Sequence, residues 1–261
     1  MTTKQEEDRS ALAAYEGFAE TYDAFTHGVY QYERWTGRLL AQAERCGLEG
    51  NRLLDVACGT GLSFLPMLER GWRVTGCDLS PAMIEVSRTK VGDEVELHVA
   101  DMRDLPLLGE FDLIWSLNDS LNYLLSVDEM RSALRSMKPN LAPDGILLFD
   151  LNTLLTYESF FTQSETRTTG GKHFLWEGQS REPGTPSAIY EARLAVEGED
   201  AAHIHRQRHF TEAEVLGAIE SAGLRCLSVL GEHEGELDEG LDESVHTTAA
   251  YICTAAATRT S

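Results

Sequence analysis

Two glycines and a carboxylate stand at the ends of two predicted strands and could hold a ligand between them. Leu53–Val56 is a short apolar run that predicts a buried strand, and residues 63–70 predict a helix. Gly59 and Gly61 occupy the turn between these elements, where glycine lets the backbone turn tightly and approach a ligand closely. Asp78 ends the next predicted strand, and a carboxylate at that place in a βαβ unit can accept hydrogen bonds from both ribose hydroxyls. The spacing therefore predicts a ligand that contains adenosine.

Two further side chains discriminate between adenosine-containing ligands. The dinucleotide fingerprint requires a small residue three places after the second glycine, so that the helix can pack closely beneath a pyrophosphate. Phe64 occupies that place and argues against NAD and FAD, and no dehydrogenase catalytic group can be named in the sequence. Asp55, which precedes the loop, disfavours a nearby phosphate and favours a cationic amine. S-adenosylmethionine (SAM) fits both observations, since it carries a ribose and an α-ammonium group but no phosphate.

The glycine loop resembles that of the class I SAM-dependent methyltransferases, whose motif reads acid-x-x-x-Gly-x-Gly, as Asp55–Gly61 does. The resemblance continues through Val95–Met102, Phe111–Trp115 and Leu141–Asp150, which look like the third, fourth and fifth strands of that family. It implies an α/β fold with a doubly wound, mostly parallel, seven-stranded Rossmann-like sheet. It also implies SAM as the cofactor.

The same resemblance implies which residues contact SAM. Asp101 would accept a hydrogen bond from the adenine amino group, and the backbone N–H of Met102 would face a ring nitrogen. Leu117 sits where the family holds the methionine moiety, and Tyr22 lies on helices that in this family fold over the cofactor. The full predicted set of cofactor residues is Tyr22, Asp55, Ala57, Gly59, Gly61, Asp78, Leu79, Met83, Asp101, Met102 and Leu117.

The hydrophobic pattern changes character after residue 150. Between residues 52 and 150, alternating strand and helix patterns predict a parallel, doubly wound sheet, and helical spacing covers much of residues 10–48. Beyond residue 150 the alternation stops. The segments 172–179, 187–197 and 202–210 then predict a small antiparallel sheet, with an additional edge strand near 165–169.

The last part of the chain would complete the main sheet. A helix is predicted over 211–222 and strands over 224–231 and 245–254, while the acidic segment 232–243 predicts a solvated loop. The patterns divide the chain into N-terminal helices plus a SAM-binding core (1–151), an inserted antiparallel lid or substrate sheet (152–210) and the C-terminal part of the core sheet (211–261).

An antiparallel sheet between the fifth strand and the last helix resembles a subgroup of small-molecule methyltransferases, which includes enzymes that methylate the amino groups of deoxysugars and other small amines. The segments Tyr22–Phe25 and Asp119–Leu124 also look like that subgroup. The predicted function is SAM-dependent methyl transfer to a small-molecule acceptor. An amine is favoured, because a neutral amine needs little base catalysis and the sequence shows no strong base or metal set. O- or S-methylation and a catalytically silent SAM-binding protein remain alternatives.

Polar and aromatic residues beyond the fourth predicted strand could bind the acceptor. Asn118 and Asn122 are predicted substrate contacts, and Tyr123 is predicted to orient the acceptor or to take its proton through water. Alternatively, Tyr123 packs at a helix start with its hydroxyl in solvent. Trp176, on the first inserted strand, either lines the substrate pocket or packs within the sheet, and Trp35 is predicted to pack in the core.

Three histidines share one parity on a predicted strand and would point to the same face of the sheet. His203, His205 and His209 allow three interpretations: a solvated face, a base that lines the substrate pocket, or a metal site. His205 and His209 are the catalytic candidates, since they are nearer the point where the strand returns to the core. No metal is predicted, because no matching carboxylate cluster accompanies them.

Composition excludes several other kinds of partner. The net charge of −21, from 43 acidic and 22 basic residues, repels a phosphate backbone and argues against nucleic acid. No apolar run approaches the roughly 18 residues that span a bilayer, so no membrane association is predicted. The odd number of cysteines, 5, without a C-x-x-C pair, favours reduced thiols and a cytoplasmic location. A homodimer through the exposed edge of the inserted sheet is possible.

Overall fold

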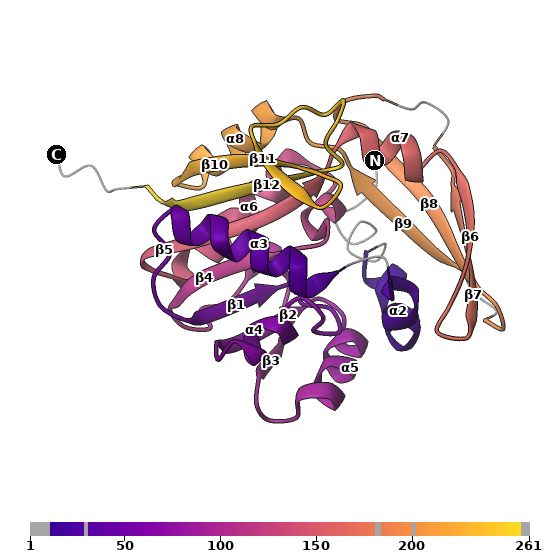
Figure 1. Ribbon diagram of the computed structural model, residues 1–261, viewed down its shortest axis with the longest axis horizontal. Helices are drawn as coiled ribbons and strands as arrows, with labels where there is room; N and C mark the ends of the chain where they lie inside the picture. Colours follow the sequence, from indigo (N-terminus) through magenta and orange to yellow (C-terminus); the bar gives the residue numbers. More distant parts are fainter. Residues whose placement is uncertain (1–10, 29–30, 181–183, 200–201, 257–261) are drawn as a thin grey trace.

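Alternating strands and helices build a large central sheet with helices on both faces (Figure 1). The computed structural model describes residues 11–28, 31–180, 184–199 and 202–256. The strands of the central sheet run in the order β11-β10-β12-β5-β4-β1-β2-β3, with β1 to β5 parallel and β12 antiparallel to β5 and β10. Their bounds are β1 Arg52–Val56, β2 Arg73–Asp78, β3 Glu96–Val99, β4 Phe111–Ser116, β5 Leu141–Asn152, β10 Leu224–His233, β11 Glu236–Glu239 and β12 Thr248–Ala255.

The strand side chains alternate between two cores because successive residues point to opposite faces. On β1, Leu53 packs in one buried cluster with residues of α3, α4 and α5, whereas Leu54 packs in another with residues of α6 and α8. The helices are α2 Ala19–Thr26, α3 Tyr32–Arg45, α4 Leu65–Glu69, α5 Pro81–Val91, α6 Val127–Met137, α7 Leu154–Phe160 and α8 Glu212–Ser221, and the 3₁₀ turns are η1 Met102–Asp104, η2 Ser120–Tyr123 and η3 Lys138–Asn140. The predicted α/β, doubly wound, mostly parallel fold is confirmed.

One correction concerns the number of strands in this sheet. The acidic segment predicted as a solvated loop contains β11, which pairs with β10 and makes the sheet eight-stranded. Glu234 and Gly235 form the two-residue turn, with φ of 50° and 81°, the combination that suits a tight hairpin. Leu237 packs against the core, and the carboxylate of Glu236 accepts hydrogen bonds from Arg34 and Arg38 of α3. This strand was missed in the sequence analysis because the segment is acidic, a composition typical of a solvated loop.

A second, antiparallel sheet follows β5 and α7, in the order β6-β7-β8-β9. Its strands are β6 Ser164–Thr169, β7 Lys172–Gly178, β8 Ile189–Val196 and β9 His203–Arg208, so the inserted sheet and its edge strand are as predicted. Figure 1 shows this sheet beside the main sheet, with α2 next to its lower end. Phe18, in the N-terminal segment, packs in one buried cluster with Phe174, Leu194 and Val196 of the second sheet.

The N-terminal segment thus packs on the inserted sheet. The division of the chain into domains at residues 151 and 210 stays a prediction. Among the described residues, no helix has the length and apolar character that crossing a bilayer requires.

Gly59 and Gly61, in the loop after β1, differ in the free space around them, so alanine substitutions should destabilise the protein to different extents. A Cβ on Gly61 would lie 2.6 Å from Cζ of Phe64 and 2.9 Å from Oγ of Ser87, whereas a Cβ on Gly59 would meet no atom within 4 Å. Both residues have positive φ, so each alanine costs about 1–2 kcal/mol for the left-handed backbone. We expect Gly61→Ala to cost about 1–3 kcal/mol more than Gly59→Ala, because it overpacks a buried contact. Denaturant unfolding of the two variants measures this difference, and equal losses would contradict it.

Candidate active site

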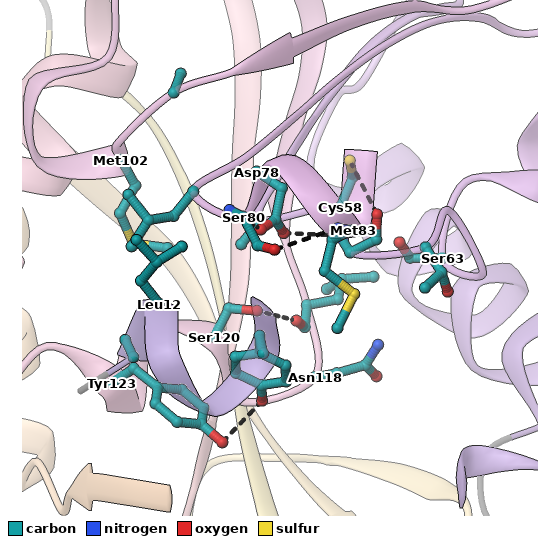
Figure 2. A pocket seen from close by; sticks show the side chains of 18 of the residues that line it. Leu12, Cys58, Ser63, Asp78, Ser80, Met83, Met102, Asn118, Ser120 and Tyr123 are labelled. Atoms are coloured by element: carbon teal, nitrogen blue, oxygen red, sulfur yellow. Dashed lines mark hydrogen bonds between the residues drawn. The ribbon is translucent and has the colours of Figure 1, made fainter. Parts of the chain in front are cut away.

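A cavity lies at the edge of the main sheet where β1, β2, β3 and β4 end, because parallel strands deliver their carboxyl ends to the same edge. Figure 2 shows this cavity, with Asp78, Ser80 and Met83 on one side and Tyr123, Ser120 and Asn118 on the other. Nearly all of the predicted cofactor residues line it, namely Tyr22, Ala57, Gly59, Asp78, Leu79, Met83, Asp101, Met102 and Leu117. The side chains converge from four strand ends and from the N-terminal segment.

Asp78 is held in place by the backbone around it. The N–H groups of Gly59 and Ser80 each donate a hydrogen bond of 2.8 Å, to Oδ2 and Oδ1 respectively. Burial raises the pKa of Asp78, and these backbone donors counteract that rise. The carboxylate keeps further lone pairs toward the cavity, which is the arrangement that accepting from a diol requires.

Two predicted cofactor residues, Asp55 and Gly61, do not lie on the cavity wall, and their contact with the cofactor stays a prediction. Asp55 is 1 % exposed and accepts a hydrogen bond of 2.5 Å from Oγ of Ser63 beneath the loop. Burial raises its pKa to about 7. Gly61 faces Phe64 and Ser87 rather than the cavity. Both residues shape the loop from behind the cavity wall.

Asp101 has a partner that the sequence analysis did not identify. Arg103, whose side chain is 9 % exposed, places Nε 3.0 Å from Oδ1 and Nη2 2.7 Å from Oδ2 of Asp101, and its Nη1 donates to Glu129 at 2.8 Å. Arg103 and Glu129 also line the cavity. Any ligand that bonds to Asp101 shares the carboxylate with this guanidinium. The position of Arg103, two residues after the acid at the end of β3, was the available sequence signal.

A second cavity adjoins the first, and Tyr15, Tyr22 and Tyr123 line both. The hydroxyl of Tyr15 donates to that of Tyr123 at 2.7 Å, and the Tyr123 hydroxyl lies 2.7 Å from Nδ1 of His205. The alternative in which Tyr123 points its hydroxyl into solvent is therefore wrong. Tyr15 was not among the predicted site residues.

The second cavity is largely aromatic. Trp176 lines this cavity, in agreement with one of the two alternatives predicted for it. Its Nε1 donates to the backbone oxygen of Phe160 at 2.7 Å. His205 also lines it, and the side-chain Nε2 has no hydrogen-bond partner among the described residues. The other aromatic residues of the wall are Tyr15, Phe18, Tyr22, Phe25, Tyr123, Phe160, Phe161 and Phe174.

The solvated-face interpretation of the three histidines is wrong, because His203, His205 and His209 are all buried. The shared parity is real, but this face of β9 packs against the N-terminal segment and the main sheet. His209 lines none of the cavities described here, and its Nε2 lies 2.7 Å from Glu243, so the structure does not bring this catalytic candidate to the site. His209 follows the end of β9, four residues beyond His205, so the two side chains lie in different surroundings.

The two predicted asparagines also differ in position. Asn118 lines the first cavity and a third one. Asn122 is fully buried; its Nδ2 donates to the backbone oxygen of Arg208, and its Oδ1 accepts from the backbone N–H of Asn152, both at 2.9 Å. Both ends of the Asn122 amide are thus bonded to the backbone, and its predicted substrate contact stays a prediction.

Asp119 is the main side chain that the sequence analysis missed at the second cavity. It lines the second and the third cavities, and its Oδ2 accepts hydrogen bonds from Nδ2 of Asn152 at 3.0 Å and from Nε2 of Gln207. Trp35 lines the third cavity, packs against the core as predicted and donates from Nε1 to Asp150 at 3.3 Å. No group of three potential metal-binding side chains gathers within the described part of the chain, and the prediction of no metal stays a prediction.

Comparison with known proteins agrees with this geometry. Residues 53–145, from β1 into β5, match a family model described as a methyltransferase domain. The chain is 27 % identical over 241 residues to a putative methyltransferase of Geobacillus sp. (strain WCH70), covering 88 % of this chain and 97 % of that protein. It is 29 % identical to the dTDP-3-amino-3,6-dideoxy-alpha-D-glucopyranose N,N-dimethyltransferase of Streptomyces fradiae, covering 81 % and 86 % of the two chains.

Among solved structures, a SAM-dependent methyltransferase from Clostridium acetobutylicum superposes with a TM-score of 0.77 at 19 % identity, over 93 % of this chain and 99 % of the other. That likeness concerns the fold. Residues 53–145, which carry the glycine loop and the strand ends that line the first cavity, thus match a methyltransferase domain, and the fold of the chain is like that of a SAM-dependent methyltransferase.

Proposed function

We propose that the protein methylates an amine nitrogen of a small molecule, with SAM in the first cavity and the acceptor in the second. The observation that carries this proposal is that the two cavities share the wall formed by Tyr15, Tyr22 and Tyr123. Methyl transfer requires acceptor and donor to be aligned with water excluded, and two adjoining cavities provide that arrangement.

The residues of the first cavity fit SAM. Asp78, fixed by two backbone N–H groups, would accept from the ribose hydroxyls. Asp101 and Met102 would face the adenine, and Leu117 and Asn118 would lie beside the methionine moiety. When bound, SAM supplies a methyl group activated by the sulfonium.

The tyrosines and the histidine of the shared wall act as hydrogen-bonding groups rather than strong bases. Burial raises the pKa of Tyr15 and Tyr123, so both stay protonated near neutral pH. Burial also lowers the pKa of His205 to about 3, with a smaller contribution from His203, so its ring is neutral. Tyr123 would orient the acceptor, and His205 would hold Tyr123 and present Nε2 to the second cavity.

This chemistry favours an amine over a hydroxyl acceptor. A hydroxyl usually needs a base to raise its nucleophilicity, whereas a neutral amine already carries a free lone pair. The relative from Streptomyces fradiae is named for the dimethylation of an amino sugar, which supports an amine of this general kind.

A product assay tests the proposed acceptor class. We expect incubation with SAM and a panel of small amines, phenols and thiols to give N-methylated products. Mass spectrometry that locates the added methyl group measures the outcome. Methylation of only oxygen or sulfur would contradict the amine proposal, and no product with any class would support a silent SAM-binding protein.

Removing the Tyr123 hydroxyl tests its orienting role. We expect Tyr123→Phe to lower kcat/KM about tenfold or more, because it breaks the hydrogen bonds to Tyr15 and His205, while binding of S-adenosylhomocysteine changes less than twofold. Tyr190→Phe is the matched control, since its hydroxyl bonds to the backbone of Thr185 and the residue lines none of the cavities described here. Unchanged turnover in Tyr123→Phe would remove this residue from the mechanism.

Replacing the Asp78 carboxylate tests the cofactor site. We expect Asp78→Asn to weaken binding of S-adenosylhomocysteine about tenfold to a hundredfold, since charge-assisted hydrogen bonds contribute about 1.5–3 kcal/mol. Calorimetry measures the affinity, and Asp144→Asn, at an exposed position of β5, is the control. Equal affinity in Asp78→Asn and wild type would place the cofactor elsewhere.

A further inference from the structure

We propose that Asp119 binds the amine of the acceptor, and that the acceptor is a small cationic amine without a phosphate group. This inference rests on the proposed N-methylation and names the class of its substrate. Four features carry it: the position of Asp119, its unequal carboxylate oxygens, the aromatic wall opposite, and the balance of charge along the cavities.

Asp119 stands where the second and third cavities join. The two cavities share Asp119, Asn152, Thr156 and Phe160, so they form one groove that starts at the tyrosine wall and reaches the turn between β10 and β11. The residue has φ of 54°, and its backbone N–H donates to Oδ1 of Asp150 at 2.8 Å. The left-handed turn after β4 therefore fixes the side chain at this junction.

The two oxygens of the Asp119 carboxylate have different surroundings. Oδ2 accepts from the side-chain amides of Asn152 and Gln207. Oδ1 makes no hydrogen bond to any residue that the structure describes. A carboxylate anchored through one oxygen, with the other oxygen available in a cavity, suits a ligand that donates N–H.

Aromatic rings surround the space next to this carboxylate. Phe18, Tyr22, Phe25 and Trp176 line the same cavity, and the rings of Phe25 and Trp176 stack with centroids 6.4 Å apart. Aromatic faces attract alkylammonium groups through the cation–π interaction. His205, 3 % exposed and without a partner for Nε2 among the described residues, adds one polar atom to this wall.

The charges along the groove disfavour a phosphorylated acceptor. Its acidic residues are Asp119, Asp150, Glu165, Glu232 and Glu234, and its basic residues are Arg34 and Arg167. Each arginine is already paired, Arg34 with Glu236 at 3.0 Å and Arg167 with Glu165 at 3.1 Å. A diphosphate placed in this groove would meet net negative charge, whereas a cation would be attracted.

Asp119 could also take the proton that the bound amine must lose. An ammonium donor R–NH₃⁺ transfers one proton to the carboxylate, which leaves a neutral amine with a free lone pair and a carboxylic acid. Burial raises the pKa of Asp119 to about 7, with a further contribution from Asp150, and Gln207 and Asn152 oppose the rise. A group with a pKa near the working pH is suited to this transfer.

The test compares two ligands of the same shape, phenethylamine and phenethyl alcohol, by calorimetry at pH 8 with S-adenosylhomocysteine saturating the first cavity. We expect the amine to bind wild type at least tenfold more tightly than the alcohol, and Asp119→Asn to abolish that preference. Thymidine diphosphate, added alone, should not bind. Asp144→Asn is the matched control, since Asp144 also has positive φ, at 62°, but is an exposed residue of β5 outside the groove.

The variant is expected to fold, which keeps the test decisive. Asparagine tolerates a left-handed backbone, and an amide removes a charge that opposes folding. The folded state raises the pKa of Asp119 above its unfolded value, so ionisation of this carboxyl destabilises the fold. The loss of stability grows as pH rises from about 4 to about 7 and is complete above that range. The melting temperature of Asp119→Asn at pH 8 should thus not fall below that of wild type.

The outcomes separate this inference from the proposed function. An amine that binds no better than the alcohol, a preference that survives in Asp119→Asn, or binding of thymidine diphosphate overturns the role of Asp119 or the acceptor class. If amines are N-methylated equally by wild type and by Asp119→Asn, the inference fails and the proposed function stands. If only oxygen or sulfur is methylated, the proposed function itself fails.

Discussion

A buried network of amide side chains joins the two sheets and holds Asp119 in the wall of the second cavity. Asn122 of η2 donates to the backbone of Arg208 at the end of β9 and accepts from the backbone of Asn152 at the end of β5. Asn152 and Gln207 are in turn bonded to each other at 3.1 Å and to Asp119. Buried amides are costly unless each donor and acceptor is paired. This pairing fixes the inserted sheet against the main sheet where the second and third cavities meet.

The N-terminal segment closes the same space from the other side, and it does so through contacts to both cavities. Its aromatic residues pack on the inserted sheet, while its acids bond to the cofactor edge of the main sheet. Oγ of Ser80 donates to Glu16 at 2.6 Å, and Oγ1 of Thr60 and Nζ of Lys90 each lie 2.5 Å from Asp23. Tyr15 and Tyr22 lie on this segment. Groups that touch the cofactor cavity therefore also shape the acceptor cavity, so the two sites are built as one unit.

The sequence predicted the sheet and the cofactor edge well because these follow from local signals. Alternating hydrophobicity and turn glycines are read within a few residues, so β1 to β5 and the loop of Gly59 were found. The burial of His205 depends on which face of β9 meets the N-terminal segment, and the exclusion of His209 from the site depends on its pairing with Glu243; both are long-range contacts. The same holds for Asp119, whose partners Asn152 and Gln207 lie 33 and 88 residues away. Strand β11 was missed for another reason, because its hairpin turn lies inside an acidic run.

Two neighbouring buried carboxylates show how burial can serve structure in one case and chemistry in the other. Asp150 has its pKa raised to about 6, yet both of its oxygens accept hydrogen bonds, from the backbone N–H groups of Asn118 and Asp119 and from Trp35. The Asp150 carboxylate has a structural role, because its hydrogen bonds to Asn118 and Asp119 hold the left-handed turn after β4 in place. Among the residues that the structure describes, Asp119 has donors on Oδ2 only. A buried charge with incomplete pairing costs stability, and such costs concentrate where a ligand completes the pairing. The contrast within one turn is the reason that the proposed contact with the acceptor is assigned to Asp119 rather than to Asp150.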